Sequence, residues 1–210
     1  MIYSENILIC IAIPLLIALI FTDSSTRRFI TAFLTGMAIC LLSAYISGFV
    51  HFVSEISKND TAVYYAPLIE ELMKLMPLLF YMFVFGPRDN ELFIVSTGIG
   101  LGFATFENCC YILSFGASSL TYVLVRGMSA GVLHLVCAIA LVLGLAMSRR
   151  FKVMSVPAVI GAVSMAMIFH GLYNLLVSEP GISSYIGYAF PPVIAVVLYL
   201  PYKIISVIKA

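Results

Sequence analysis

Long apolar segments constrain this chain more than any other feature of its sequence. They cover about residues 5–22, 29–54, 62–86, 91–115, 120–148, 153–178 and 186–208. A helix needs roughly 20 mostly apolar residues to cross a bilayer, and 62% of this chain is hydrophobic against about 45–50% in soluble domains. The sequence therefore predicts a single all-α transmembrane domain over residues 1–210, a polytopic membrane helix bundle of about seven (six to eight) helices.

Basic residues lie mostly between alternate pairs of these segments, which places them on one side of the membrane. They are Arg27, Arg28, Arg88, Arg149, Arg150, Lys152, Lys203 and Lys209. The opposite side carries Lys58 and several acidic residues. By the positive-inside rule, we expect a multi-pass protein of the cell membrane with an extracytoplasmic N-terminus and a cytoplasmic C-terminus. The net charge of +1 does not suggest a nucleic-acid partner.

The third segment contains a charged cluster, Glu70-Glu71-x-x-Lys74, in a chain where only 10% of residues are charged. A charged side chain at the centre of a bilayer costs roughly 2.5–3.5 kcal/mol on insertion scales. Such a cluster is retained where its members are paired, face the protein interior or take part in chemistry. Pro67 precedes the cluster and Pro77 follows it, so we expect this segment to be bent or shallow.

Polar residues also interrupt the fourth, fifth and sixth segments. They are Glu107, Asn108, Arg126, His134, His170 and Asn174. Most of them lie within about eight residues of the outer end of their segment, which corresponds to a depth of about 12 Å at the rise of an α-helix. Because four segments place polar groups at similar depth, we predict one polar site among spans three to six, in the outer half of the membrane.

Small residues are spaced for close helix packing in the segments that carry these polar groups. They are Gly98, Gly102, Gly127, Gly131 and Gly161. Small residues let membrane helices approach one another closely. We therefore expect the polar helices to pack on one another as a core, about residues 60–178, with the spans at 5–22, 29–54 and 186–208 more peripheral.

Four motifs in this core, taken in order, resemble those of a known family. They are Glu70-Glu71-x-x-Lys74, Gly102-Phe103-Ala104-x-x-Glu107-Asn108-x-x-Tyr111, Arg126 followed by His134, and His170-Gly171-Leu172-Tyr173-Asn174. The set resembles PrsW-family intramembrane proteases, which are distantly similar to the CAAX-prenyl endopeptidases and to the Aph-1 subunit of gamma-secretase. The resemblance implies a membrane-embedded endopeptidase that cuts a membrane protein near the extracytoplasmic side, such as an anti-sigma factor in regulated proteolysis.

Peptide hydrolysis needs an activated water, a polarised carbonyl and an acid for the leaving amine. In a glutamate mechanism, Glu70 or Glu71 acts with His170 to activate the water. Asn174, with or without His134, then donates to the developing oxyanion.

In a metal mechanism, His134, His170 and Glu107 are the expected ligands of a Zn²⁺ ion, and a second glutamate is the base. Lys74, Asn108 and Arg126 are supporting residues in both mechanisms. The sequence leaves the choice between zinc and a metal-free glutamate mechanism open.

Two other functions fit the same polar residues. Carboxylates and histidines within a membrane also form proton or ion relays, so a proton- or ion-coupled transporter is one alternative. No inverted repeat is evident among the apolar segments, which disfavours a transporter. A membrane scaffold without catalytic activity, as in the resemblance to Aph-1, is the other alternative, and retention of the glutamates and histidines disfavours it.

Overall fold

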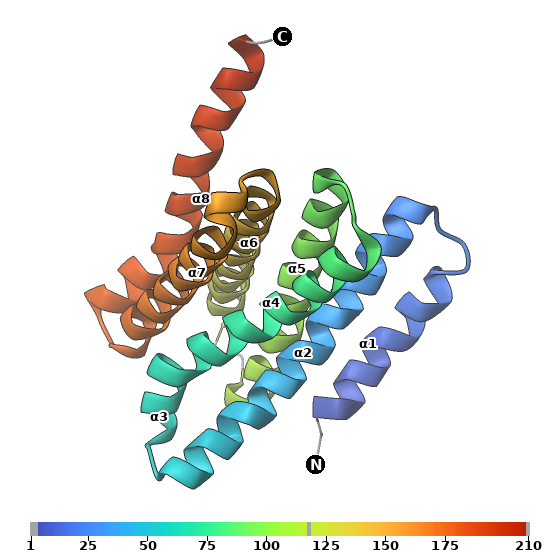
Figure 1. The fold of residues 1–210 in the computed structure, drawn as a ribbon. Helices are drawn as coiled ribbons and strands as arrows, with labels where there is room; N and C mark the ends of the chain where they lie inside the picture. Colours follow the sequence, from blue (N-terminus) through green and yellow to red (C-terminus); the bar gives the residue numbers. More distant parts are fainter. Residues whose placement is uncertain (1–3, 117–118, 209–210) are drawn as a thin grey trace.

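Long helices make up the computed structural model, which describes residues 4–116 and 119–208 (Figure 1). The α-helices are α1 (Ser4–Ala18), α2 (Ser24–Ser54), α3 (Lys58–Asp60), α4 (Ala66–Phe85), α5 (Asp89–Phe115), α6 (Leu120–Arg150), α7 (Ser155–Ser178) and α8 (Ile182–Ile208). A π-helical segment, η1 (Thr61–Tyr65), leads into α4, and a 3₁₀ turn, η2 (Lys152–Met154), leads into α7. The described ranges contain no strand, which confirms the all-α prediction.

Four of these helices, α2, α5, α6 and α7, are long and apolar enough to cross a bilayer. The helix α1 and the apolar part of α8 at Ile182–Val197 are shorter. The helix α4 has 20 residues and carries the three charges of the Glu-Glu-x-x-Lys cluster. A membrane protein is therefore established, and a total of seven crossings stays a prediction. Lys209, used to predict orientation, lies outside the described residues.

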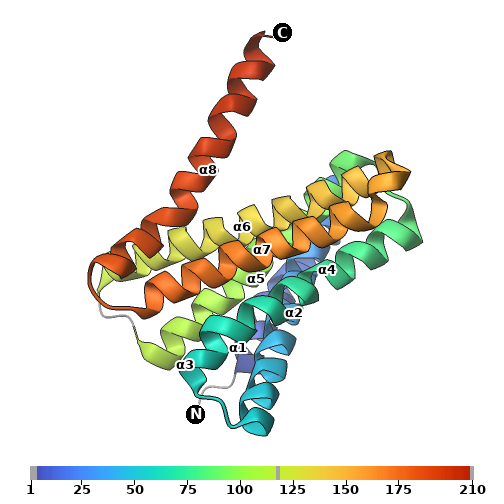
Figure 2. The same ribbon diagram turned by 60° about the vertical axis from the view of Figure 1, so that its left-hand side comes forward.

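Neighbouring helices in the bundle pack along one another in the order α1, α2, α5, α6 and α7, and α4 contacts both α2 and α7. The first half of α8 packs on α6 and α7, and its end projects away from the other helices (Figure 2). The four helices that carry the predicted polar residues, α4 to α7, thus surround a common space.

The closest helix contact joins α2 to α5 through glycines. A Cβ atom added at Gly102 would lie 2.0 Å from the Phe33 carbonyl oxygen, and one at Gly36 would lie 2.2 Å from that of Ile99. Such distances exclude any side chain. The glycine spacing on α5 was expected to join the polar helices to one another, but Gly98 and Gly102 face α2, which carries none of the polar site.

Other glycines differ in their surroundings. Gly100 does face α6, where an added Cβ would lie 2.9 Å from the His134 carbonyl oxygen. Gly127, Gly131 and Gly161 have open space at the Cβ position, so they do not mediate the close packing that their spacing suggested.

Arginines from two separate parts of the chain lie at one end of the bundle, near the start of α5. Arg28, at the start of α2, pairs with Glu91 at 3.1 Å. Arg149, at the end of α6, donates to the Pro87 carbonyl oxygen at 2.5 Å and also pairs with Asp89. These contacts agree with the sequence-based assignment of Arg28 and Arg149 to the same side of the membrane.

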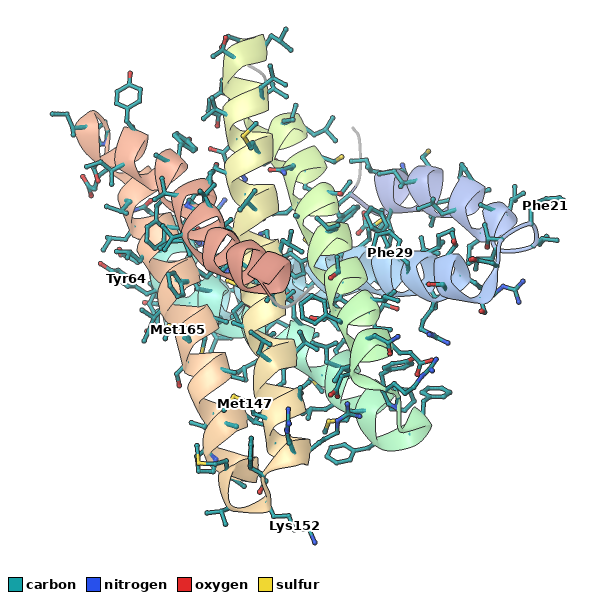
Figure 3. All side chains as sticks on the ribbon, turned by 90° about the horizontal axis from the view of Figure 1, so that it is seen from above. Phe21, Phe29, Tyr64, Met147, Lys152 and Met165 are labelled. Atoms are coloured by element: carbon teal, nitrogen blue, oxygen red, sulfur yellow. The ribbon has the colours of Figure 1, made fainter. Side chains whose placement is uncertain are left out.

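Large apolar side chains point outward around the bundle, as the view from above shows (Figure 3). Met165 on α7 is 50% exposed, and Phe52 on α2 and Phe83 on α4 are more exposed still. An apolar surface this extensive is unusual for a soluble protein and suits contact with lipid. The polar side chains of the core are turned inward instead.

Candidate functional site

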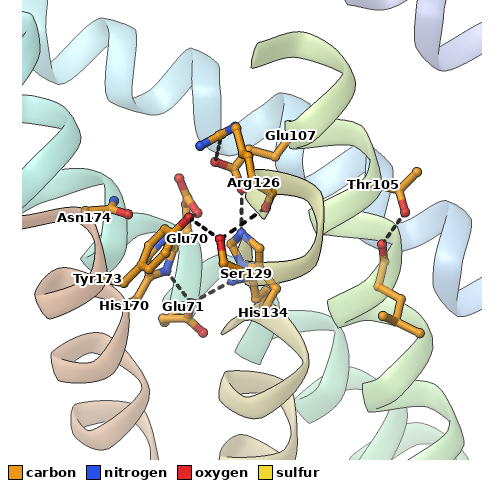
Figure 4. A network of polar contacts seen from close by, with 12 residues as sticks. Glu70, Glu71, Thr105, Glu107, Arg126, Ser129, His134, His170, Tyr173 and Asn174 are labelled. Atoms are coloured by element: carbon orange, nitrogen blue, oxygen red, sulfur yellow. Dashed lines mark hydrogen bonds and ion pairs between the residues drawn. The ribbon is translucent and has the colours of Figure 1, made fainter. Parts of the chain in front are cut away.

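Charged and polar side chains from four helices form one connected chain at the centre of the bundle (Figure 4). It runs from Arg126 through Glu107, His134, Lys74, Glu71 and His170 to Glu70. The helix α4 supplies the two adjacent glutamates and the lysine, α5 supplies Glu107, α6 supplies Arg126 and His134, and α7 supplies His170. The structure thus joins residues that sequence reasoning placed at similar depth.

Lys74 lies at the middle of this chain and is fully buried. Its Nζ donates to Glu71 Oε1 at 2.6 Å and lies 2.7 Å from His134 Nδ1. It also lies 4.2 Å from the centroid of the Phe103 ring, within the range of a cation–π contact. Since an ammonium group only donates, His134 Nδ1 accepts and the ring proton is on Nε2.

Glu107 accepts a hydrogen bond from the Nε2–H group of His134. His134 Nε2 lies 2.5 Å from Glu107 Oε2, and Arg126 donates to the other carboxylate oxygen at 3.3 Å. The central carbon of the Arg126 guanidinium, Cζ, lies 3.3 Å from the centroid of the Tyr111 ring, and Arg126 is almost fully buried. Arg126 is therefore the counter-ion of Glu107, and Glu107 fixes the orientation and tautomer of His134.

The other end of the chain contains an incomplete contact. His170 Nδ1 donates to Glu71 Oε1 at 2.8 Å, which leaves the Nε2 lone pair of a neutral ring facing Glu70 Oε2 at 3.6 Å. Glu70 Oε2 and Glu71 Oε2 are both buried without a hydrogen-bond partner. A lone pair opposite a carboxylate oxygen needs a proton, a water molecule or a cation between them.

The donor set at this position fits a metal ion. Glu70, His134 and His170 each offer a ligand atom, and the three atoms lie within 4.8 Å of one another. Ligand atoms around a tetrahedral zinc lie about 3.4 Å apart, so these groups would have to move closer together to hold zinc, and His134 would have to release Lys74 or Glu107. Sequence reasoning chose Glu107 as the third ligand, but Glu107 lies behind His134, where a carboxylate commonly orients a metal-binding histidine.

The two asparagines of the predicted site lie apart from this chain. Asn174 donates from Nδ2 to the Ala62 carbonyl oxygen at 3.0 Å, in the segment before α4. The Asn108 Oδ1 atom is buried without a hydrogen-bond partner. The role of Asn174 as a donor to the oxyanion therefore stays a prediction, because its amide group donates to the Ala62 carbonyl oxygen in this structure.

Sequence reasoning did not select Ser129 and Tyr173, which adjoin the site. Their hydroxyl groups lie 3.1 Å apart, and Ser129 also donates to the Arg126 carbonyl oxygen at 3.3 Å. Both residues are buried. The signal was the helical spacing, because Ser129 follows Arg126 by three positions and Tyr173 follows His170 by three.

A groove of about 580 Å³ between α6 and α8 has Ser129 in its lining. Its lining includes Ser129, Tyr122 and Val125 from α6, together with Tyr185 and Tyr188 from α8. The groove thus borders α6 at Ser129, three residues after Arg126.

Fold and site together define a class of protein, a helical membrane protein with a buried histidine–carboxylate centre. The chain matches the PrsW family intramembrane metalloprotease over residues 24–204, and it therefore belongs to this family. The match extends from α2 into α8, beyond the motif-bearing core. No curated protein and no solved structure matched the chain.

Proposed function

We propose that this protein is an intramembrane endopeptidase that hydrolyses a peptide bond of a membrane protein near the extracytoplasmic side. The observation that carries the proposal is the incomplete contact between His170 Nε2 and Glu70 Oε2, 3.6 Å apart within a membrane helix bundle. The family to which the chain belongs favours this function over a transporter or a scaffold without activity. An anti-sigma factor is the kind of substrate that the family resemblance suggests.

Glu70 is the residue best placed to take a proton from the attacking water. Oε1 of the neighbouring Glu71 already accepts hydrogen bonds from Lys74 and His170, so Glu71 acts mainly to hold these two groups in place. Glu70 keeps a buried oxygen, Oε2, without a hydrogen-bond partner, and a water molecule bound to this oxygen would lie beside His170 Nε2. His170, held by Glu71, orients that water.

In a zinc mechanism, the proposed ligands are Glu70, His134 and His170, in place of the set that included Glu107, and Glu70 then binds the metal instead of acting as the base. A zinc ion bound there would supply a Lewis acid and lower the pKa of a bound water. Glu107 and Lys74 hold His134 from its two ring nitrogens, so binding of a metal by His134 requires one of these contacts to give way.

Purified variants incubated in detergent with a single-pass membrane substrate test the proposal. We expect Glu70→Gln and His170→Ala to lower the cleavage rate at least about 100-fold, the usual size of a general-base effect. Glu179→Gln, an exposed glutamate at the end of α7, is the matched control and is expected to cleave as the wild type does. Cleavage by Glu70→Gln at the wild-type rate would refute the proposal.

Metal analysis of the same preparations separates the two mechanisms. A zinc mechanism predicts about one bound metal ion per chain in the wild type, its loss in Glu70→Gln and His170→Ala, and inhibition by chelators. Active wild-type protein that holds no metal and resists chelators would establish the glutamate mechanism instead, with Glu70 as the base.

A further inference from the structure

One carbonyl group in the segment before α4 lacks its helical partner. The Ala62 oxygen would accept from the N–H of residue 66 in an α-helix and from that of residue 67 in a π-helix. The Ala66 N–H binds the Thr61 oxygen, and residue 67 is a proline, which has no N–H. Pro67 therefore leaves the Ala62 oxygen available to a donor from outside the helix.

Asn174 supplies that donor from another helix. Its Nδ2 atom lies 3.0 Å from the Ala62 oxygen, so a side chain of α7 replaces the missing backbone donor. Close to this bond, a groove of about 370 Å³ lies between the two segments, lined by Pro67 and Leu68 on one side and by Gly171 and Leu172 on the other. Side chains do not fill this space, so packing contributes little to the spacing of the two helices here. The hydrogen bond between Asn174 and Ala62 therefore has a larger part in setting that spacing.

Both helices joined in this way carry the proposed reacting groups. Glu70 lies three residues after Pro67, near the start of α4, and His170 lies about one turn before Asn174 on α7. We propose that Pro67 and Asn174 act as a pair, in which Pro67 frees the Ala62 carbonyl and Asn174 binds it, and that this bond sets the separation of Glu70 and His170. Asn174 is thus a positioning residue, and this inference rests on the proposed function for its effect on catalysis.

A double-mutant cycle tests the pair. Asn174→Leu keeps the side-chain size and removes the donor, whereas Pro67→Ala restores an N–H that competes for the Ala62 oxygen. We expect Asn174→Leu to lower kcat about tenfold with KM within twofold, and Pro67→Ala to lower kcat by a smaller factor. The double variant is expected to match Asn174→Leu, because both changes remove the same bond.

Two other results would overturn the inference. A loss of about 100-fold or more in Asn174→Leu, with Pro67→Ala unchanged and the two effects additive, would establish Asn174 as an oxyanion donor. A lowered unfolding temperature in Asn174→Leu with unchanged kcat would show a structural role only.

Thermal unfolding separates failure of this inference from failure of the proposed function. If even the wild type cleaves no substrate, the proposed function fails, but the cycle can still be read from unfolding temperatures. We then expect Asn174→Leu to lower the unfolding temperature of the wild type and to have a clearly smaller effect in the Pro67→Ala background. Equal effects in the two backgrounds would overturn the pairing of Pro67 with Asn174.

Discussion

The two sides of this bundle are held together by different means. Where α2 meets α5, glycines bring the backbones into contact, and no space remains at Gly36 or Gly102 for even a methyl group. Where α4 meets α6 and α7, buried ion pairs and hydrogen bonds join the helices, and oxygens of Glu70 and Glu71 have no partner. The contact between α2 and α5 has no space left to fill, whereas the contact among α4, α6 and α7 leaves two buried oxygens that a water molecule or a cation could satisfy.

Helix α5 belongs to both sides. Gly98 and Gly102 are four residues apart and face α2, whereas Gly100 and Glu107 face α6. Residues two apart on a helix point in nearly opposite directions, so one helix presents a close-packed face and a polar face. A rigid α2–α5 pair therefore supports Glu107, and through Glu107 it supports His134.

The largest effect should come from breaking the polar side at its centre. Glu71→Leu leaves the Lys74 ammonium fully buried without its carboxylate, at a cost of about 3–5 kcal/mol for a broken buried pair. We expect the unfolding temperature to fall sharply and cleavage to be lost. Unfolding followed by circular dichroism in detergent measures the first effect, and the substrate assay measures the second.

The double variant Glu71→Leu/Lys74→Met is the control for this prediction. Replacing both members of a buried pair by apolar residues is often close to neutral, so we expect much of the stability to return while cleavage stays absent. If the double variant is no more stable than Glu71→Leu, the unpaired charge of Lys74 is not the cause of the loss.

Breaking the glycine side should have the next largest effect. Gly102→Ala places a methyl group 2.0 Å from the Phe33 carbonyl oxygen, so the two helix backbones must separate, at a cost of about 1–3 kcal/mol. Gly161→Ala is the same substitution within α7, where nothing lies within 4 Å, and it should be neutral or slightly stabilising. Equal unfolding temperatures for the two variants would contradict a close α2–α5 contact.

The sequence predicted the helices well because charged and turn-forming residues interrupt the apolar runs. The segment predicted at 120–148 became α6, Leu120–Arg150. The prediction was less accurate for the third segment, at 62–86. The α-helix α4 begins only at Ala66, and the π-helical segment Thr61–Tyr65 precedes it. Apolar periodicity does not distinguish a π-helix from an α-helix. Pro67 has no N–H, so it cannot donate to the Ala62 carbonyl oxygen as residue i+5 of a π-helix would.

The sequence could predict that polar groups from four helices lie together, but it could not predict the direction of each side chain around its helix. Counting residues placed Glu70, Glu107 and His170 at similar depth, and the structure joins them in one chain of contacts. The same count gave no reason to prefer Glu70, which is now proposed as a metal ligand, over Glu107. It likewise did not show that Asn174 contacts Ala62, because that contact depends on how α7 is rotated against the segment before α4.

The smallest effect is expected where a polar bond lies within close-packed helices. Ser96 on α5 donates to the Ala138 carbonyl oxygen on α6 at 2.6 Å, and its side chain is buried. Ser96→Ala removes this bond between helices and should cost about 0.5–1.5 kcal/mol. Ser148→Ala is the matched control, because Ser148 donates to the Leu145 carbonyl oxygen of its own helix.

Comparing the two serine variants shows whether one hydrogen bond between α5 and α6 adds to packing that is already tight. A lower unfolding temperature for Ser96→Ala than for Ser148→Ala, with cleavage retained in both, would mean that a hydrogen bond also stabilises the close-packed contact between α5 and α6. Equal unfolding temperatures would mean that the Ser96 hydrogen bond adds no measurable stability to the contact between α5 and α6. Gly100 already brings these two backbones together two turns along α5 from Glu107, so close packing would be enough to hold the helices at that level.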